Sequence, residues 1–530
     1  MSFSSDNPES AEGPLLELIP EEEVSTEQKA FRVATASADE AISDRLYRFR
    51  RKPWCFDDFI RENDDSEFAY WCENGTILCV QCGIFFFRHM KESWEDCLPA
   101  SFQGQNVCFS IELCDSYKSL WCTIYGKTDT TVAETLTWFL SLEFSNETQQ
   151  PLTIKGSRPR GKGTSFDFAA LQPEQLARIL DKHSAMQLDW TSITWSPELS
   201  VILATRPYPM NWKMAQRFCD GGTTFVDALQ AREASFGALS FTLNSSFGPL
   251  SLTNLRRLFQ LEGIFDKLDL ECCEKEYALL PFSANVATLK YQLEAIDLEP
   301  NDFDSLDIVP KDLRLSINLL RSRSSWGGWV VSLLNRVAEL AHFERLDLLL
   351  FRFRWDDDDL QNAALVAEAL IRAVQCNPNL SFLDLSSASP IFTRLNWTPY
   401  LERICDAVEN NNGLDTCTIA VFDPKNESFY SLLEEVLSRN RRITVCDKSG
   451  NVITNGSTIE WIYAVNRFHN KMTRLARECT SVRPTLMAMA VATNAPTSFV
   501  FTAMFISNLT DLLCECVDGL DLEEEPSSDL

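Results

Sequence analysis

The segment ALIRAVQCNPNLSFLDLSS, residues 369–387, decides the fold. Its first part continues an apolar pattern of helical spacing that covers residues 360–374. Its second part has the order apolar-x-x-Leu-x-apolar, at Leu380, Leu383 and Leu385, which is typical of a short strand. Neither element can cover an apolar core alone, so the pair predicts a unit that stacks against similar units.

The strand pattern recurs along the chain. It occurs at Phe236/Leu239/Phe241, Phe265/Leu268/Leu270, Val286/Leu289/Tyr291, Leu313/Leu315, Phe343/Leu346/Leu348, Leu380/Leu383/Leu385 and Leu414/Cys417/Ile419. Helical patterns lie between these positions at 330–340, 400–408 and 429–437. Two earlier helices are expected to begin near Pro173 and Pro197, because proline followed by an acid favours a first helical turn.

A strand and a helix repeated every 20 to 40 residues are typical of a solenoid. We therefore expect the α/β class over residues 165–450, with parallel strands on one side and helices on the other. An ordinary α/β domain of alternating strands and helices is the alternative.

The unit at 369–387 resembles a leucine-rich repeat of the ribonuclease-inhibitor type. In that family Asn or Cys usually stands three residues after the last strand leucine and stacks into a ladder. Three units keep this pattern, at Asn244, Cys273 and Asn318, and three depart from it, at Phe351, Ala388 and Phe422. The whole chain is also similar to leucine-rich-like proteins of unicellular algae, including its segment 508–514. The resemblance implies a stacked leucine-rich-like array and no particular activity.

A β-rich module of aromatic residues and cysteines is expected at 54–147. Patterns at 76–82, 107–113 and 120–125 predict antiparallel strands, and 132–144 predicts a helix. Residues 148–164 are polar, basic and contain Gly and Pro, so they predict a linker. The basic cluster 45–52 predicts a short helix with a solvated face, or alternatively a nuclear-import patch.

The acidity of the chain is concentrated at its ends. The 530 residues carry 76 Asp and Glu against 48 Lys and Arg, a formal net charge of −28. The two ends, 1–41 and 518–530, hold about half of this excess, and both predict disorder because they have little apolar area to bury. An acidic chain argues against nucleic acid as a partner, since phosphate attraction requires a basic face.

Residues 451–517 predict a helical cap that shields the last repeat. Within them, 484–510 carries no charge, but Asn494 and Pro496 interrupt its centre, so two short buried helices fit better than a membrane span. The first residues lack the basic and apolar regions of a secretory signal. The 18 cysteines then predict buried thiols in a cytoplasmic protein, with a nuclear location as the alternative.

Metal and catalytic motifs are weak. Cys79 and Cys82 have zinc-knuckle spacing, and Cys72, His89 and Cys97 could complete four ligands, but the apolar flanks favour buried thiols. Residues 156–164 nearly spell a phosphate-binding loop, with Gly163 where Ser or Thr should stand. Asp356–Asp359 lacks the ligand spacing of a calcium loop and predicts a helix N-terminus. We expect no enzyme and no cofactor, with zinc as an alternative.

The outward side chains of the repeated strands form the expected partner-binding face. Its candidate residues are Asp269, Glu271, Lys290, Gln292, Arg314, Asp347, Leu349 and Asp384. Their mixed charge suits a protein or peptide. The sequence thus predicts a non-enzymatic scaffold or recognition protein that binds another protein. The alternatives are an adaptor or substrate receptor of a larger complex, such as a ubiquitin ligase, and an enzyme or zinc protein with its site in the Cys-rich module.

Overall fold

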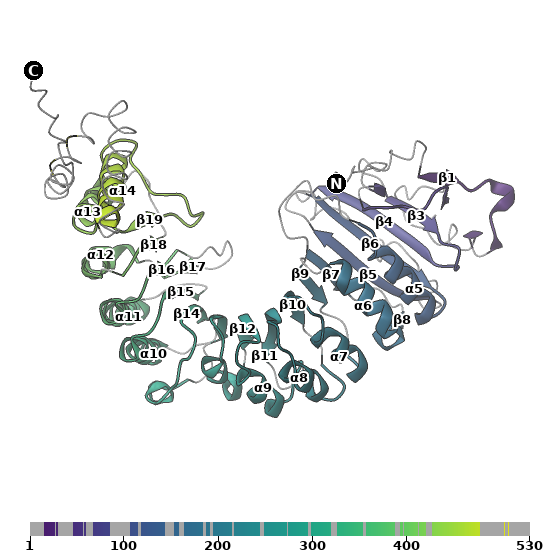
Figure 1. Cartoon of the computed structure of the whole chain (residues 1–530), viewed down its shortest axis with the longest axis horizontal. Coiled ribbons are helices and arrows are strands. Elements are labelled where there is room, and N and C mark those ends of the chain that lie inside the picture. Colours follow the sequence, from purple (N-terminus) through teal and green to yellow (C-terminus); the bar gives the residue numbers. More distant parts are fainter. Residues whose placement is uncertain are drawn as a thin grey trace, which may run out of the picture. The chain divides into compact units, whose positions relative to one another are not determined.

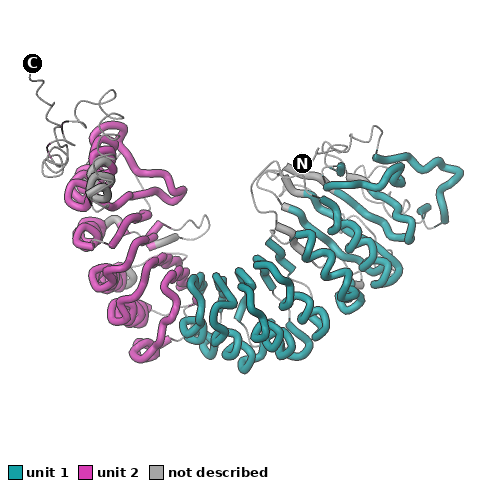
Figure 2. Tube along the Cα trace, in the orientation of Figure 1, with its two compact units in different colours: residues 1–292 teal, residues 293–530 magenta. Residues whose placement is uncertain are grey.

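The computed structural model is a mixed α/β protein that divides into two compact units, residues 1–292 and 293–530 (Figure 2). The predicted α/β class is confirmed. The structure describes residues 15–26, 28–29, 46–56, 58–59, 67–84, 106–114, 118–143, 153–157, 164–183, 187–190, 194–214, 217–243, 248–272, 274–294, 298–319, 326–352, 357–386, 393–395, 397–411, 413–419 and 427–476, with the single positions 503 and 507. The tail 518–530 and most of the uncharged stretch 484–510 lie outside them.

An antiparallel sheet opens unit 1. Its strands, in spatial order, are β3 (Glu67–Trp71), β4 (Ile77–Ile84), β6 (Lys118–Gly126), β5 (Val107–Cys114) and β7 (Thr153–Ser157). Helix α5 (Asp129–Phe139) packs on β5 and β6 and buries Val132, Leu136 and Phe139. The three predicted strands and the predicted helix of 54–147 are present, and the helix begins three residues earlier because Thr128 caps it by accepting a hydrogen bond from the Thr131 amide.

The N-terminal segment differs from its predicted disorder. Strand β1 (Leu16–Leu18) and the 3₁₀ helix η1 (Glu21–Glu23) lie within residues 15–26. Leu15, Ile19 and Val24 are buried, and the last two join an apolar cluster with sheet residues such as Tyr125. The apolar residues of this short run are enough to order it against the sheet, even though the surrounding segment is acidic and polar.

The basic cluster 45–52 is also corrected, because it contains a strand and no helix. Strand β2 (Tyr47–Phe49) pairs antiparallel with β1 and parallel with β3. Phe49 stacks on Tyr70, with ring centroids 5.2 Å apart. Arg48 pairs with Glu17 at 3.2 Å and Glu23 at 2.6 Å. Alternation of aromatic and basic side chains suits a strand, and the acids of the N-terminal segment neutralise Arg48.

The predicted linker at 148–164 contains the strand that joins the two parts of unit 1. β7 pairs antiparallel with β5 and parallel with β9 (Gln187–Trp190), so the antiparallel sheet continues directly into the parallel one. A second short strand, β8 (Thr164–Ser165), pairs with β5. The division into compact units falls after residue 292 and not at this segment. Backbone pairing, which a polar composition does not reveal, makes 153–157 part of the sheet.

Four further parallel strands follow, with helices along one side (Figure 1). The strands are β10 (Met210–Met214), β11 (Gly237–Leu243), β12 (Phe265–Cys272) and β13 (Thr288–Glu294). β10 pairs in parallel with β9 before it and with β11 after it, and β11 pairs in parallel with β12. The helices are α6 (Pro173–Lys182), α7 (Pro197–Ala204), α8 (Thr223–Gln230) and α9 (Leu252–Phe259). Proline occupies the first turn of α6 and of α7, as expected. Short 3₁₀ helices complete unit 1: η3 (Phe168–Ala170), η4 (Lys275–Tyr277) and η5 (Leu280–Ser283).

Three tryptophans form the aromatic centre of this part of the core. Trp190 of β9, Trp195 and Trp212 of β10 are each almost fully buried. The Trp190 ring lies parallel to that of Trp195 at 6.0 Å, and Trp212 meets both rings edge-on at 5.1 and 5.2 Å. Edge-to-face and offset-parallel rings at this distance attract one another beyond their burial. In β10, Trp212 stands at the position that Leu239 occupies in β11, which hides the strand from the leucine pattern; β9 keeps Leu188 at that position.

Unit 2 has the same alternation of strand and helix. Strands β14 (Asp312–Asn318), β15 (Arg345–Arg352), β16 (Phe382–Asp384), β18 (Thr416–Thr418) and β19 (Thr444–Cys446) pair in parallel in that order. Helices α10 (Trp326–Leu340), α11 (Asp357–Cys376), α12 (Leu401–Asn410), α13 (Glu427–Arg439) and α14 (Thr458–Ala476) stack in chain order (Figure 1). Short elements are η6 (Pro300–Phe303), β17 (Thr393–Arg394) and η7 (Thr398–Tyr400). The four helices predicted at 330–340, 360–374, 400–408 and 429–437 are present, and α14 lies within the predicted helical cap.

A buried asparagine links each of the last helices of unit 2 to the helix before it. Asn411, which ends α12, donates to the carbonyls of Val374 (2.7 Å) and Asn377 (3.0 Å) at the end of α11. Asn377 and Asn440 bond in the same way to Val337 and Val408, at 3.1 Å each. Carbonyls at a helix end have no partner within the helix, so these amides supply one.

Unit 1 uses a guanidinium for the corresponding contact. Arg232, just beyond α8, donates to the carbonyl of Ala204 at the end of α7 and to that of Tyr208, both at 2.8 Å. It also bonds the carbonyls of Ala234 and Ser235 at 2.7 and 2.8 Å. Burial lowers the pKa of this guanidinium somewhat from its ordinary value. Five donors in one planar group suit a position where several carbonyls converge.

Candidate functional site

One face of the parallel strands carries polar side chains in both units. Burial alternates along the whole of β10 and β11, and along β14 as far as Ile317 and β15 as far as Leu350, so every second side chain there points into the core and the others are partly exposed. Helices cover parallel sheets on both faces in most α/β proteins, and strands then read as continuous apolar runs. Here the residues between the buried ones are mostly polar and partly exposed. The candidate partner-binding residues lie on that face.

In unit 1 the charges on this face pair across neighbouring strands. Asp189 of β9 bonds Lys213 of β10 at 3.3 Å, and Asp269 of β12 bonds Lys290 of β13 at 2.9 Å. Ser240 of β11 stands between these pairs in the same row, because its register partners are Lys213 and Asp269. The row therefore alternates in sign and is close to neutral.

The other two candidates of unit 1 also meet. The side-chain amide of Gln292 donates to the Glu271 carboxylate at 3.1 Å. These two residues follow Lys290 and Asp269 by two positions on the same strands. The four candidates Asp269, Glu271, Lys290 and Gln292 thus form two cross-strand pairs on β12 and β13. Adjacent cross-strand pairs stabilise the sheet and hold these side chains in fixed positions.

In unit 2 two rows of charge cross β14, β15 and β16. Arg314, Asp347 and Asp384 are register partners in one row, and Asp312, Arg345 and Phe382 in the other. Each arginine bonds an aspartate of its own strand, Arg314 to Asp312 at 2.7 Å and Arg345 to Asp347 at 2.9 Å. The Arg345 guanidinium also lies 3.6 Å from the centre of the Phe382 ring, a cation–π contact.

Asp384 is the carboxylate left over in these rows, since two arginines face three aspartates. Among the described residues no cation lies within ion-pair distance of it; its Oδ1 accepts from the Ser386 amide and hydroxyl, both at 2.7 Å. Burial raises the pKa of Asp347, and the neighbouring Asp384 charge adds to that rise against the lowering by Arg345. The face of unit 2 is therefore slightly acidic at β16.

Leu349 is the apolar member of the candidate set. It lies on β15 beside Ser316 of β14, one row beyond the Arg314 row, and its side chain is half-buried. A partly exposed leucine next to a fixed array of charges provides an apolar contact inside a polar surround, the usual anatomy of a protein interface. The structure thus brings Arg314, Asp347, Leu349 and Asp384 together on three adjacent strands.

The zinc hypothesis concerns β4. Cys79 is buried in the apolar cluster that includes Tyr125, and the side chain of Cys82 lies outside the described residues, as do those of His89 and Cys97. Burial raises the pKa of Cys72 to about 11, which disfavours the thiolate that zinc requires. Among the side chains that the structure describes, no group of three or more His, Cys, Asp or Glu could hold a metal ion. Zinc at Cys79 and Cys82 stays a prediction.

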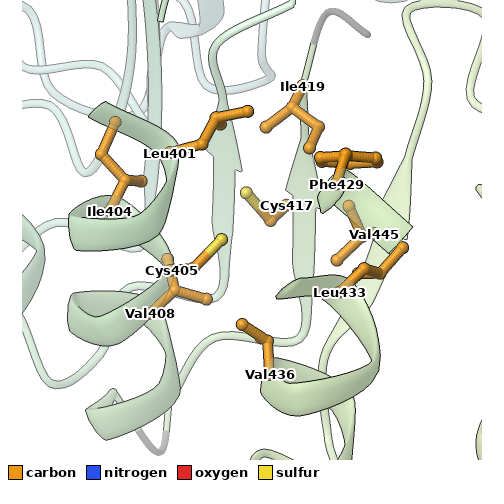
Figure 3. Close-up of a pocket in the computed structure, with 10 residues that line it drawn as sticks. All are labelled: Leu401, Ile404, Cys405, Val408, Cys417, Ile419, Phe429, Leu433, Val436 and Val445. Atoms are coloured by element: carbon orange, nitrogen blue, oxygen red, sulfur yellow. The ribbon is translucent and has the colours of Figure 1, made fainter. Parts of the chain in front are cut away.

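An apolar cavity of about 20 Å³ lies between α12, α13, β18 and β19 (Figure 3). Cys405 and Cys417 point toward it together with Val408, Val436 and Leu433. Burial raises the pKa of Cys405 to about 12 and raises that of Cys417 further, so both stay thiols. Ligand sites usually enclose 300 Å³ or more, so this cavity is a packing defect.

Filling that cavity is expected to stabilise unit 2. Val436→Ile adds one methylene to a side chain that lines it, and one buried methylene is worth about 0.8 kcal/mol. Urea denaturation followed by hydrogen exchange in α12 and α13 measures the gain. Val366→Ile, at a fully buried site on α11 that does not line the cavity, is the control and should be neutral or destabilising. A loss of stability in Val436→Ile would show that the space cannot accept the methylene.

The remaining motifs of the sequence lie mainly outside the described residues. Gly156 and Ser157 belong to β7, but 158–163 of the near phosphate-binding loop are not described, and neither are the side chains of 357–359. No helix in the described part of the chain is both long and apolar enough to cross a membrane. The asparagines at the helix ends were not singled out in the sequence, although each stands three residues before the first apolar position of the next strand.

No protein-family model matches the sequence, and no curated protein is similar enough to count as a relative.

Proposed function

We propose that this chain is a leucine-rich-like α/β solenoid that recognises another protein through the open face of its parallel strands. The observation that carries the proposal is the burial alternation along β10 and β11 and along most of β14 and β15. A parallel sheet with one face free of apolar cover, flanked by stacked helices, is the arrangement by which solenoids present a binding surface. The buried asparagines that join consecutive helices support repeated stacking.

The surface best suited to a partner lies on unit 2. There Arg314, Asp347 and Arg345 are held by their mutual ion pairs and lose little freedom when a partner binds. The Asp384 carboxylate has no ion-pair partner among the described residues, and Leu349 on the neighbouring strand provides apolar area. The complementary partner is a protein segment with a Lys or Arg next to an apolar side chain. Fixed charges of both signs discriminate against segments of the wrong charge order.

Leu349→Lys is expected to weaken binding of the partner at least tenfold, which corresponds to about 1.4 kcal/mol. The change places a charge where the interface requires apolar contact, yet the site is half-exposed, so folding tolerates it. The partner is first captured from lysate and identified, then purified, and its dissociation constant is measured by calorimetry. Asp384→Asn, which keeps the acceptor for Ser386 but removes the charge, should weaken binding several-fold and lower its salt dependence.

Leu360→Lys provides the matched control. Leu360 is a 56% exposed leucine of the same unit on α11, on the helix side. It should bind the partner within a factor of two of the unaltered protein. Equal affinities for Leu349→Lys and the unaltered chain would contradict the proposed face, and a loss shared by both leucine variants would place the interface elsewhere.

A further inference from the structure

A cleft in unit 1, separate from the strand face, has the shape and chemistry of a small-molecule site. It lies where β2 and β3 stop pairing. Their last paired residues are Arg48 and Trp71, and the segments that follow each strand line the cleft. Helix α5 closes the cleft with Glu134, Thr135 and Trp138. Its volume of about 470 Å³ falls within the range of small-ligand pockets.

The floor of the cleft is aromatic and well packed. Phe49, Trp71 and Trp138 line it, and Phe49 meets Trp138 edge-on with ring centroids 5.6 Å apart. The Phe49 ring also stacks on the Tyr70 ring. Trp71 and Trp138 are each partly exposed, and Trp71 also packs against the apolar cluster that contains Ile19 and Val24. Such aromatic surface favours a planar ring of a ligand.

One wall is cationic. Residues 48–52 supply Arg48, Arg50, Arg51 and Lys52 to the lining. Arg48 is neutralised by Glu17 and Glu23, and Arg51 is bonded by Asp58 at 3.0 Å. Arg50 and Lys52 are exposed, and the Arg50 charge acts on Glu17, whose pKa it lowers less than Arg48 does. These two cations are available for an anionic group.

The opposite wall accepts hydrogen bonds. Glu73 and Glu134 are exposed carboxylates on it. The side-chain amide of Asn74 ties the turn that carries Glu73 to α5, with bonds to Thr135 Oγ1 at 3.0 Å and to Glu134 at 3.3 Å. This wall is therefore fixed before any ligand arrives. Carboxylates here suit an amino group or a ring N–H at the end of the ligand away from its anionic group.

We propose that this cleft binds a small aromatic ligand that carries an anionic group at one end and an amino or ring N–H donor at the other. The ring would lie on Trp138, the anion between Arg50 and Lys52, and the amino or ring N–H donor toward Glu73 and Glu134. A nucleoside monophosphate such as AMP, whose donor is the amino group of the base, and tryptophan, whose donor is the indole N–H, are two sources of this chemistry. The acidity of the whole chain does not prevent it, since charges beyond about 8 Å are screened at physiological salt. The inference is independent of the strand-face function.

Calorimetric titration of the full chain with AMP, adenosine, L-tryptophan and inorganic phosphate tests the cleft. AMP or L-tryptophan should bind, and whichever does identifies the source. If AMP binds, adenosine, which lacks the anion, should bind at least tenfold more weakly. Inorganic phosphate, which lacks the ring, should also bind at least tenfold more weakly than the ligand that binds. Absence of binding by both AMP and L-tryptophan at millimolar concentration would overturn the proposal, and so would phosphate binding as tightly as AMP.

The double variant Arg50→Ala/Lys52→Ala locates the site. It should weaken the binding ligand at least tenfold, while its unfolding midpoint stays unchanged because both side chains are exposed. Arg256→Ala/Lys448→Ala removes the same charge from exposed positions outside the cleft and should bind normally. Equal affinity in the two double variants would assign the binding to another place and refute the cleft.

Discussion

Replacing Asn411 by alanine is expected to lower the free energy of unfolding of unit 2 by about 3 kcal/mol. The side chain is 5% exposed and makes three hydrogen bonds: two from Nδ2 to the carbonyls of Val374 and Asn377, and one that Oδ1 accepts from the Gly413 amide at 2.9 Å. Alanine leaves these backbone groups buried without that partner. Each unsatisfied group costs roughly 1–3 kcal/mol, and local relaxation recovers part of the sum.

Asn411→Asp should be worse than the alanine variant at neutral pH. The aspartate has the same shape, but it presents a second acceptor to two carbonyl oxygens and buries a negative charge. Acidification should recover part of the loss, because the protonated carboxyl regains a donor. Stability as a function of pH distinguishes this from a simple loss of packing.

Asn410→Ala is the matched control for both variants. Asn410 is the adjacent residue of the same type, exposed, with one bond from its amide to the Asp406 carbonyl of its own helix. It should change stability by no more than about 0.5 kcal/mol. Hydrogen exchange of α11 and α12 peptides is the measurement, because a chain of two units need not unfold in one step. Equal exchange in the Asn410 and Asn411 variants would contradict the role of the buried amide.

Lowering the pH from 6.5 to 4 is expected to remove about 3 kcal/mol of stability from unit 1 through His183. His183 ends α6, and its Nε2 bonds the carbonyl of Leu140 at the end of α5. Its ring lies 6.4 Å from that of Phe56, and the residue is 2% exposed. Burial lowers the pKa of His183 to about 4, with a smaller contribution from Lys182 and an opposing one from the Leu140 carbonyl.

The sign follows from where the proton binds. The unfolded chain takes up the His183 proton near pH 6.5, whereas the folded protein resists it until about pH 4. The contribution of this residue to stability is therefore complete above pH 6.5 and declines as the pH falls toward the folded value. His183→Gln keeps a donor for the Leu140 carbonyl but does not titrate.

Unfolding free energies of the unaltered chain and of His183→Gln, measured by urea denaturation at several pH values, test this. The difference between the two should shrink steadily over pH 6.5 to 4, while carboxylate titration affects both proteins alike. If the difference in unfolding free energy between the two proteins did not change with pH, the folded and unfolded states would bind the His183 proton equally well, which would contradict the lowered pKa.

Several strands of the parallel array could be predicted from the sequence because they use leucine at fixed spacing. The strand patterns at residues 313–315 and 346–348 became β14 and β15, and the helical pattern at 360–374 became the core of α11. Burial of alternate residues follows directly from the period of a strand. The candidates on the polar face could be chosen for the same reason, since they are the residues between the leucines.

Other parts depend on contacts that a single sequence does not display. β10 has Met210, Trp212 and Met214 at core positions, which breaks the leucine pattern without changing the physics of burial. β7 is polar and was interpreted as a linker, although neighbours on both sides bond its backbone. The cleft of unit 1 combines residues from three segments far apart in the chain. One signal was present in the sequence: Asn377, Asn411 and Asn440 each stand three residues before the first apolar residue of the next strand, which marks them as a recurring position.

The double pairing of β7 has a consequence for how the parallel array of unit 1 begins. A first strand in such an array presents a row of unpaired amides and carbonyls, which invites another chain to add on and aggregate. Here β7 occupies that row along β9, and its own far side is occupied by β5. The first parallel strand therefore has no free edge on this side, because the amides and carbonyls of β7 are hydrogen-bonded to strands on both sides. This pairing protects the parallel sheet from adding another chain along β9.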